Sequence, residues 1–328
     1  MEIFIGLLIM IVGIVILVKG ADFLIDGASK GALKLGVPEF LIGLTVVAFG
    51  TSAPELFVSV QATIADQSGL ALGNVVGSNI CNMMLILGVA VVMCKEKQPL
   101  TFSKIALKRD FPAVLLTTGF LCYFIFNDGF VIGREGQILL IFLLMYVFFI
   151  FQSLKEGDDV GIDEVPDKAE AKKSNWFMII LMVVGGLVGL VAGSELMIHG
   201  AVKIATALHI SETIIGLSVI AIGTSLPELA ATFAAMKQNK TDLVIGNVLG
   251  SNLFNILSVA GIASQFGVLK AEGLHPMNDV GFMMAFTVMV FLKVIFKPNQ
   301  LPKSFGFLLL IGYAGYVFIR FINPNTAG

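Results

Sequence analysis

Long apolar segments alternate with short polar stretches along almost the whole chain. A helix needs about 20 mainly apolar residues to cross a lipid bilayer, and unbroken hydrophobicity of that length is typical of transmembrane helices. The pattern predicts ten such helices, over residues 3–21, 37–65, 70–93, 105–126, 132–153, 177–198, 210–236, 243–266, 280–296 and 304–322. We therefore expect an all-α integral membrane protein.

Composition strengthens the membrane assignment. Of the 328 residues, 57% are hydrophobic and only 13% are charged, and the mean hydropathy is +0.93. A soluble domain would carry about 25% charged residues. The three cysteines are expected to be reduced thiols that act as small apolar side chains. We expect no nucleic-acid partner and no obligate protein partner; the expected surroundings are the lipid bilayer.

The basic residues predict an orientation. When each of the 21 lysines and arginines is assigned to the span end or loop that it flanks, 17 fall on one side of the membrane. The other side receives only Arg134, Lys203, Lys270 and Arg320. Because lysine and arginine are enriched in cytoplasmic loops, we expect a multi-pass protein of the plasma or inner cell membrane. Both termini would lie outside the cytoplasm, and the linker 154–175 inside.

The chain contains an internal repeat. Residues Ile42–Gly88 align with Ile215–Gly261 at a constant offset of 173 residues, with 21 identities in 47 positions. Each half has five predicted spans, and an odd number places two homologous halves in opposite orientations. This is the inverted-topology repeat of many secondary transporters. The predicted organisation is a first repeat at 1–153, the linker 154–175, and a second repeat at 176–328.

Each repeat carries an acid inside an apolar span, in the sequences Gly50–Glu55 (GTSAPE) and Gly223–Glu228 (GTSLPE). The proline removes a helical hydrogen bond and clashes with the preceding turn, so the second and seventh helices are predicted to be broken. Such breaks expose backbone carbonyls, and buried carboxylates are costly and usually functional. Carbonyl, hydroxyl and carboxylate oxygens together suit hard cations such as Ca²⁺ or Na⁺. The candidates are Ala48, Thr51, Ser52 and Glu55, with Ala221, Thr224, Ser225 and Glu228.

A second repeated element follows each motif, at residues 73–82 and 246–255. A short turn separates the two elements, so a helical hairpin is expected to bring Asn82 level with Glu55 and Asn255 level with Glu228. The serines at 78 and 251 are either cation ligands or packing residues. The other asparagines, at 74, 79, 247 and 252, are expected to join helices. The polar residues Asp22, Asp26, Glu195 and His199 are expected near the ends of the first and sixth spans, as interfacial groups or as an ion entry.

These motifs resemble the α-repeats of the Ca²⁺/cation antiporter superfamily, in the prokaryotic branch of sodium/calcium exchangers. The resemblance covers the topology of the whole chain and is most specific in residues 43–88 and 216–261. It implies that Glu55 and Glu228 are central ligands shared by Ca²⁺ and Na⁺. The remaining ligands it implies are Thr51, Ser52, Thr224, Ser225, Ser78, Ser251 and the carbonyls of Ala48 and Ala221, with Asn82 and Asn255 opposite the glutamates.

One position departs from the family pattern. Several members, including potassium-dependent ones, have Asp where this chain has Asn255. Two carboxylates neutralise one Ca²⁺ and leave no surplus charge, so K⁺ dependence is not expected. The proton-coupled branch typically has a GN-x-x-E pattern where this chain has Thr-Ser-x-Pro-Glu, so that branch fits less well.

The functional hypothesis is a secondary active antiporter that exchanges Na⁺ for Ca²⁺ by alternating access, without a cofactor. Two alternatives remain open: exchange of Ca²⁺ or another divalent cation for H⁺, and a cation channel. A membrane enzyme is not expected, because the sequence has no nucleophile–base pair and no histidine-rich metal set.

Overall fold

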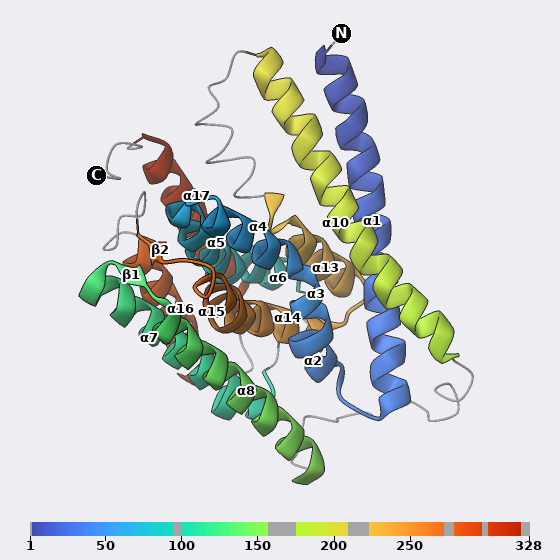
Figure 1. Ribbon diagram of the computed structural model, residues 1–328. Coiled ribbons are helices and arrows are strands. Elements are labelled where there is room, and N and C mark those ends of the chain that lie inside the picture. Colours follow the sequence, from blue (N-terminus) through green and yellow to red (C-terminus); the bar gives the residue numbers. More distant parts are fainter. Residues whose placement is uncertain are drawn as a thin grey trace. The chain divides into compact units, whose positions relative to one another are not determined.

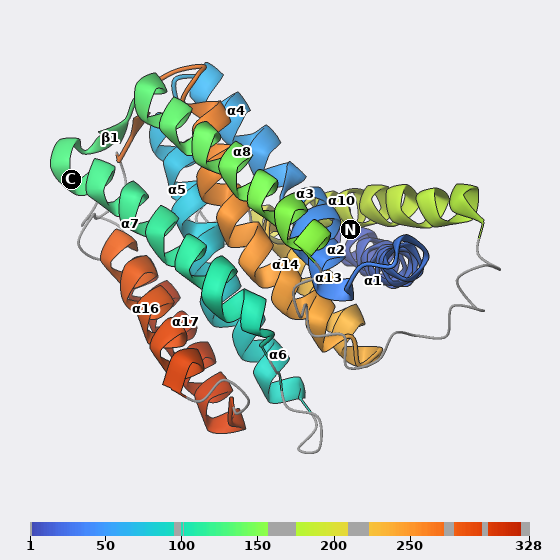
Figure 2. The same cartoon turned by 90° about the horizontal axis from the view of Figure 1, so that it is seen from below.

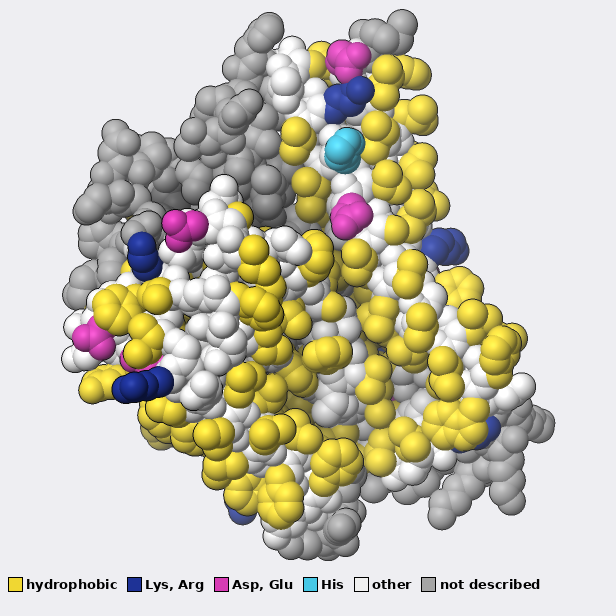
Figure 3. All heavy atoms as spheres, viewed as in Figure 1, with side chains coloured by type: hydrophobic (Ala, Val, Ile, Leu, Met, Phe, Trp, Pro, Cys, Tyr) yellow, Lys and Arg dark blue, Asp and Glu magenta, His cyan; other side chains and the backbone are white. Residues whose placement is uncertain are grey.

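The structure is a computed structural model, and it describes residues 2–94, 100, 102–156, 175–208, 223–271, 279–296 and 301–322. Among these residues, seven helices are long and apolar enough to cross a membrane, and two shorter apolar helices follow at Gly281–Phe296 and Lys303–Ile319. Among the described side chains drawn in Figure 3, hydrophobic ones are far more widespread than charged ones, as expected where lipid is the solvent. The seventh predicted span, 210–236, lies partly outside the described residues; its second half is the helix α13.

The chain forms two compact units, and each takes segments from both sequence repeats. Unit 1 comprises Met1–Thr51 and Val165–Asn247, and unit 2 comprises Ser52–Glu164 and Val248–Gly328. The units therefore do not coincide with the two repeats, whose boundaries at 1–153 and 176–328 remain a prediction from sequence.

Two long helices dominate unit 1: α1 (Glu2–Leu35) and α10 (Trp176–Ala207), which lie side by side in Figure 1. The second predicted span begins in this unit with α2 (Glu39–Ile42), a π-helical segment η1 (Gly43–Val47) and α3 (Ala48–Thr51). The other described helices of unit 1 are α13 (Leu226–Lys237) and the first half of α14 (Thr241–Phe254).

The predicted ends of the first and sixth spans, at residues 21 and 198, are wrong. No proline follows Lys19 before Pro38, so α1 continues to Leu35. There Gly36 takes a left-handed conformation (φ +69°), and Val37 N–H bonds to Ala32 O at 3.0 Å. This is a glycine-terminated Schellman end. At 34 residues, or about 51 Å at 1.5 Å per residue, α1 exceeds a bilayer core of about 30 Å. The residues expected near the span ends therefore lie inside α1 and α10: Asp22, Asp26, Glu195 and His199.

Glycine at every seventh position holds α1 against α10. A methyl group on Gly6, Gly13 or Gly20 would lie 2.9 Å from the carbonyl oxygen of Gly200, Gly193 or Gly186, respectively. The residue numbers fall along one helix as they rise along the other, so the pair is antiparallel. Small residues at such spacing allow backbones to approach closely in a membrane, where packing rather than hydrophobicity drives helix association.

We expect Gly193→Ala to lower the thermal stability of the purified protein. A methyl group there would lie 2.5 Å from Leu17 N and 2.7 Å from Leu17 Cα, both backbone atoms that move only if the helices separate. Overpacking of this kind costs about 1–3 kcal/mol. The matched control is Gly185→Ala on the same helix, where nothing lies within 4 Å; better helix propensity should leave it as stable or more stable. Equal melting temperatures for both variants in detergent would disprove the close approach.

Unit 2 begins with a helical hairpin, α4 (Ala53–Ile64) and α5 (Ser68–Ile80), continued by the π-helical segment η2 (Cys81–Ile86) and by α6 (Leu87–Met93). Next come the π-helical η3 (Ala106–Asp110), α7 (Phe111–Asp128) and α8 (Gly133–Glu156). The unit ends with the π-helical η5 (Asn255–Ala260), α15 (Gly261–Ala263), α16 (Gly281–Phe296) and α17 (Lys303–Ile322). Figure 2 shows α16 beside α7.

Two strands of two residues each, β1 (Phe130–Val131) and β2 (Leu269–Lys270), pair antiparallel in unit 2. They were not predicted, because two residues carry no periodic signal. None of the three cysteines forms a disulfide, and all three are buried. Burial raises the pKa of the Cys94 thiol, which disfavours the reactive thiolate.

The repeat is visible in local geometry. The turn after α4 contains Asp66 at φ 58°, and the turn after α13 contains Asn239, 173 residues later, at φ 59°. Both are residue types that tolerate the left-handed region.

A tyrosine of the last helix in each repeat bonds to an aspartate just before the helix that precedes it. Tyr146 Oη donates to the buried Asp110, directly before α7, at 2.7 Å, and Tyr316 Oη donates to the buried Asp279, just before α16, at 3.0 Å. The similarity therefore extends beyond Gly261, where the sequence alignment ends.

Candidate functional site

The helix is broken at the same position in both repeats. Ser52 separates α3 from α4 with φ −86° and ψ 4°, and Ser225 precedes α13 with φ −89° and ψ 5°. Pro54 and Pro227 then occupy the first turn of the following helix, where a missing N–H costs little. Each glutamate therefore lies in the first turn of a helix that begins inside the predicted span. This confirms the predicted break in the second helix, and at Ser225 in the seventh.

Unit 1 contains the glutamate of the second repeat with residues of the first. Glu228 is 1% exposed, and its helix α13 packs against α3, which carries Ala48 and Thr51. The Thr51 hydroxyl lies 3.4 Å from the carbonyl oxygen of Ala48 and 3.3 Å from Oδ1 of Asn247, whose residue is also buried. The motif residues Thr224 and Ser225 are buried in the same unit.

Unit 2 contains the glutamate of the first repeat, again with residues of both. Glu55 is 1% exposed, and the Ser78 hydroxyl donates to its Oε1 at 3.5 Å, the long limit of a hydrogen bond. Its helix α4 packs against α5 and also against η5, which begins at Asn255. The remaining predicted site residues of this unit are buried as well: Ser52, Asn82, Ser251 and Asn255.

Several of these buried polar atoms have no hydrogen-bond partner among the described residues. They are Nδ2 and Oδ1 of Asn255, Nδ2 of Asn82, Oγ of Ser225 and Oγ of Ser251. An unpaired buried polar group costs about 1–3 kcal/mol. Both repeats nevertheless keep such side chains, which is consistent with a bound ligand that completes their interactions. Three of the atoms are oxygens, Asn255 Oδ1, Ser225 Oγ and Ser251 Oγ, and oxygens suit a hard cation.

The asparagines divide into two classes. Asn74 Nδ2 donates to the backbone oxygen of Glu55 at 3.1 Å, and Asn247 accepts from Thr51, so these two join helices as predicted. Asn79 and Asn252 instead donate to carbonyls of their own helix, Val75 O and Val248 O, both at 2.7 Å. The described hydrogen bonds of these two amides therefore stay within one helix, and their role in joining helices remains a prediction.

Sequence reasoning missed two features of the site. The first is the hydroxyl one turn after each glutamate, Ser59 and Thr232; both are buried, and Ser59 Oγ accepts from Asn74 at 3.0 Å. The signal was present, since position i+4 from each glutamate carries a hydroxyl and lies on the same helix face. The second is that Asn82 and Asn255 lie in the π-helical η2 and η5. Such segments occur frequently at functional sites, but they leave no pattern in sequence.

Ala221 lies outside the described residues, as does most of the linker 154–175. Among the described residues, no group of three or more His, Cys, Asp or Glu side chains is placed to hold a metal ion. The described oxygens are therefore mainly hydroxyls and amides, with one carboxylate per repeat.

Buried oxygens at paired helix breaks in a polytopic helical protein are typical of secondary membrane transporters. The chain belongs to the sodium/calcium exchanger protein family, whose model matches residues 5–152 and 178–322. This is a family of transporters, not of enzymes, and the predicted resemblance is confirmed.

The similar proteins cover nearly the whole chain. A putative antiporter, CaxA of Alkalimonas amylolytica, is 35% identical over 90% of this chain and 92% of its own length. The sodium/calcium exchanger MaX1 of Methanosarcina acetivorans is 31% identical over the same shares. The sodium-calcium exchanger NCX_Mj, in a structure soaked with Na⁺ and Sr²⁺, matches with a TM-score of 0.80 and 29% identity over 98% of both chains. The predicted fold class, ten transmembrane helices in two inverted repeats, is confirmed by this match.

Proposed function

We propose that this protein exchanges Na⁺ for Ca²⁺ across the cell membrane by alternating access, through overlapping cation sites near the midplane built on Glu55 and Glu228. The other proposed ligands are Thr51, Ser52, Thr224, Ser225, Ser78, Ser251, Asn82, Asn255 and the carbonyls of Ala48 and Ala221. Family membership and relatives named as sodium/calcium exchangers support the choice of ions.

One observation carries the proposal: at the helix break of each repeat a glutamate is buried to 1% exposure, in units whose buried residues include hydroxyl and amide groups. The repeats contribute equivalent residues at a spacing of 173, and inverted repeats place their sites at the interface between them. Oxygen ligands of this kind are those of Ca²⁺.

Charge explains why exchange would be obligatory. Two ionised carboxylates balance one Ca²⁺, or two Na⁺ ions. Without a cation, two negative charges would remain inside the membrane, which is expensive, so the empty transporter would cross between its two access states rarely. An antiporter needs this property, since a ligand-free return would uncouple the fluxes.

The test is flux in proteoliposomes that contain the purified chain. With the pH clamped on both sides, an imposed Na⁺ gradient should drive Ca²⁺ against its own gradient. If only a pH gradient drives Ca²⁺ movement, then H⁺ rather than Na⁺ is the coupling ion. Flux that needs no counter-ion and does not saturate would identify a channel and overturn the proposal.

We also propose that both termini lie outside the cytoplasm and that residues 154–175 lie inside. The contacts in unit 1 support the sidedness: Lys203 pairs with Glu2 at 2.8 Å, and Lys240 pairs with Glu39 at 2.6 Å. Glu2, at the N-terminus, and Lys203 both fall on the side predicted to be outside. Glu39, at the start of the second predicted span, and Lys240, between the seventh and eighth, both fall on the side predicted to be inside. A cysteine introduced at Lys173 should react with a membrane-impermeant maleimide only after the cell is opened, and labelling in intact cells would reverse the orientation.

A further inference from the structure

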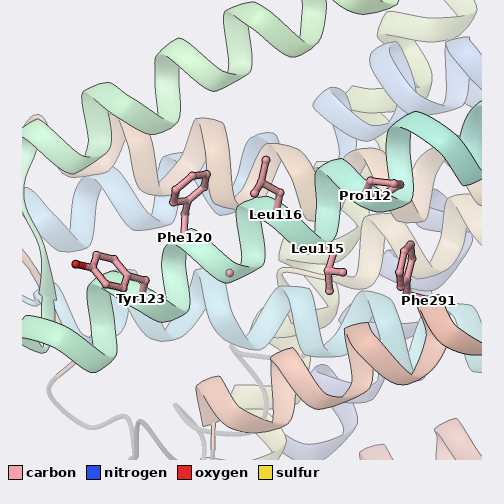
Figure 4. Close-up of a pocket in the computed structure, with 7 residues that line it drawn as sticks. Pro112, Leu115, Leu116, Phe120, Tyr123 and Phe291 are labelled. Atoms are coloured by element: carbon pink, nitrogen blue, oxygen red, sulfur yellow. The ribbon is translucent and has the colours of Figure 1, made fainter.

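An open apolar groove lies on the surface of unit 2, between α7 and α16 (Figure 4). It encloses about 660 Å³. Five of its lining side chains come from α7 and one from α16: Pro112, Leu115, Leu116, Phe120, Tyr123 and Phe291. Leu116 and Tyr123 are 53% and 63% exposed, so the groove opens to the outside of the protein. In a membrane-spanning helix, such a surface faces lipid.

The groove has the length of one lipid tail. Its α7 residues run from Pro112 to Tyr123, and 11 steps of 1.5 Å give about 16 Å. This is close to half of a bilayer core of about 30 Å, which is the thickness of one leaflet. Gly119 forms part of the floor, and a methyl group there would meet only Met284 Cε at 3.8 Å, an ordinary contact. The glycine therefore leaves room that a larger side chain would occupy.

Basic residues gather at one end of the groove. Lys104 and Lys108 precede Pro112 at intervals of four residues, and both are exposed. The two lining helices are antiparallel, since Pro112 lies beside Phe291 and Gly119 beside Met284, so Lys293 of α16 lies at this same end. Among the described residues, none of these three lysines has a carboxylate within 4.0 Å. Their charge is therefore available to an anion outside the protein.

We propose that this groove binds an anionic phospholipid, with one acyl chain along α7 between Pro112 and Tyr123 and the phosphate headgroup beside Lys104, Lys108 and Lys293. An apolar groove of leaflet length that ends at three lysines matches both parts of such a molecule. A second copy of the chain fits less well, because a symmetric pair in one membrane would bring like-charged lysines together. A zwitterionic lipid would fill the groove but would not use the charges.

The experiment compares lipid retention by native mass spectrometry of the full-length protein, titrated with phosphatidylglycerol or phosphatidylcholine. The wild type should retain phosphatidylglycerol preferentially. The triple variant Lys104→Gln, Lys108→Gln and Lys293→Gln should lose that preference. The ratio of phosphatidylglycerol to phosphatidylcholine affinity should fall by roughly fivefold for each lysine replaced, because one basic residue near an anionic surface contributes about 1 kcal/mol. Gly119→Leu should reduce retention of both lipids, because its side chain fills the groove.

Two controls make the comparison specific. Lys270→Gln removes a charge at the opposite end of α7, where β2 pairs with β1, and Gly315→Leu adds the same bulk on α17 at a glycine with nothing within 4 Å. Both should behave as wild type. No preference in the wild type, or an unchanged preference in the triple variant, would overturn the proposal. A change of oligomeric state in Gly119→Leu with unchanged lipid retention would assign the groove to a second copy instead. The readout needs no transport, so it is independent of the proposed exchange.

Discussion

Glu55→Gln is expected to abolish Na⁺-driven Ca²⁺ transport, and Glu228→Gln is expected to do the same. Glutamine keeps the volume and one oxygen of glutamate but removes its charge. Two unit charges 4 Å apart at an effective dielectric constant of 20 attract by about 4 kcal/mol, so a divalent ion should bind at least roughly a thousandfold more weakly. The measurement is the initial rate of Ca²⁺ uptake into proteoliposomes at a saturating Na⁺ gradient.

The matched control is Glu135→Gln. Glu135 lies in the first turn of α8, where its Oε2 accepts from Ile132 N–H at 2.8 Å, and the glutamine oxygen can accept the same bond. This variant should transport normally. Normal Ca²⁺ transport by either Glu55→Gln or Glu228→Gln would place the cation site elsewhere.

Stability separates a transport role from a structural one. If Glu55 served mainly as a hydrogen-bonding group, its replacement should destabilise the protein, since breaking a buried network typically costs several kcal/mol. The hydrogen bond from the Ser78 hydroxyl to its carboxylate is long, at 3.5 Å. We therefore expect Glu55→Gln to melt at or above the wild-type temperature in cation-free buffer, because one buried charge is gone. A marked loss of melting temperature would favour the structural role.

The membrane fold and the centre of the site were predictable because they rest on strong, repeated signals. A glutamate after a proline inside an apolar span is costly in lipid, which indicates a function. The same motif recurs 173 residues later, so a chance occurrence does not explain it. The break at Ser52 follows from Pro54, which lacks an N–H and whose ring clashes with the preceding turn. The hairpin turns at Asp66 and Asn239 follow from polar residues that interrupt an apolar pattern.

The remaining features depend on packing that leaves no local signal. The predicted ends of α1 and α10 are wrong because the apolar pattern weakens before the helices end. The later turns of α1 are held by packing on α10, where a methyl group on Gly27 or Gly31 would meet Met182 Cβ at 2.9 Å or Ile179 Cγ2 at 3.5 Å. The π-helical turn that carries Asn255 differs from an α-helix by one backbone hydrogen-bond step, which no residue pattern specifies. The division into two units is likewise a property of contacts between distant segments.

Asn255→Asp is expected to change the ion selectivity of transport, because this position decides how many charges the site holds. Asn255 is fully buried, and neither atom of its amide has a hydrogen-bond partner among the described residues. A carboxylate there would add a third negative charge. At the separation used above for the glutamates, about 4 Å, and an effective dielectric constant of 20, the carboxylate attracts each unit of cation charge by about 4 kcal/mol. The gain is doubled for a divalent ion, so Ca²⁺ should bind more tightly relative to Na⁺.

The measurement is the Na⁺ concentration that half-inhibits Ca²⁺ uptake, repeated with and without K⁺. We expect that concentration to rise by at least roughly tenfold in Asn255→Asp, and K⁺ to affect the rate only in this variant, since three carboxylates exceed the charge of one Ca²⁺. The control is Asn175→Asp, an exposed residue whose side-chain oxygen accepts from Phe177 N–H at 3.1 Å and can do so as a carboxylate. An Asn255→Asp protein with the wild-type ion profile would place this side chain outside the ligand shell. Position 255 would then have no part in setting the charge of the site, which Glu55 and Glu228 would set by themselves.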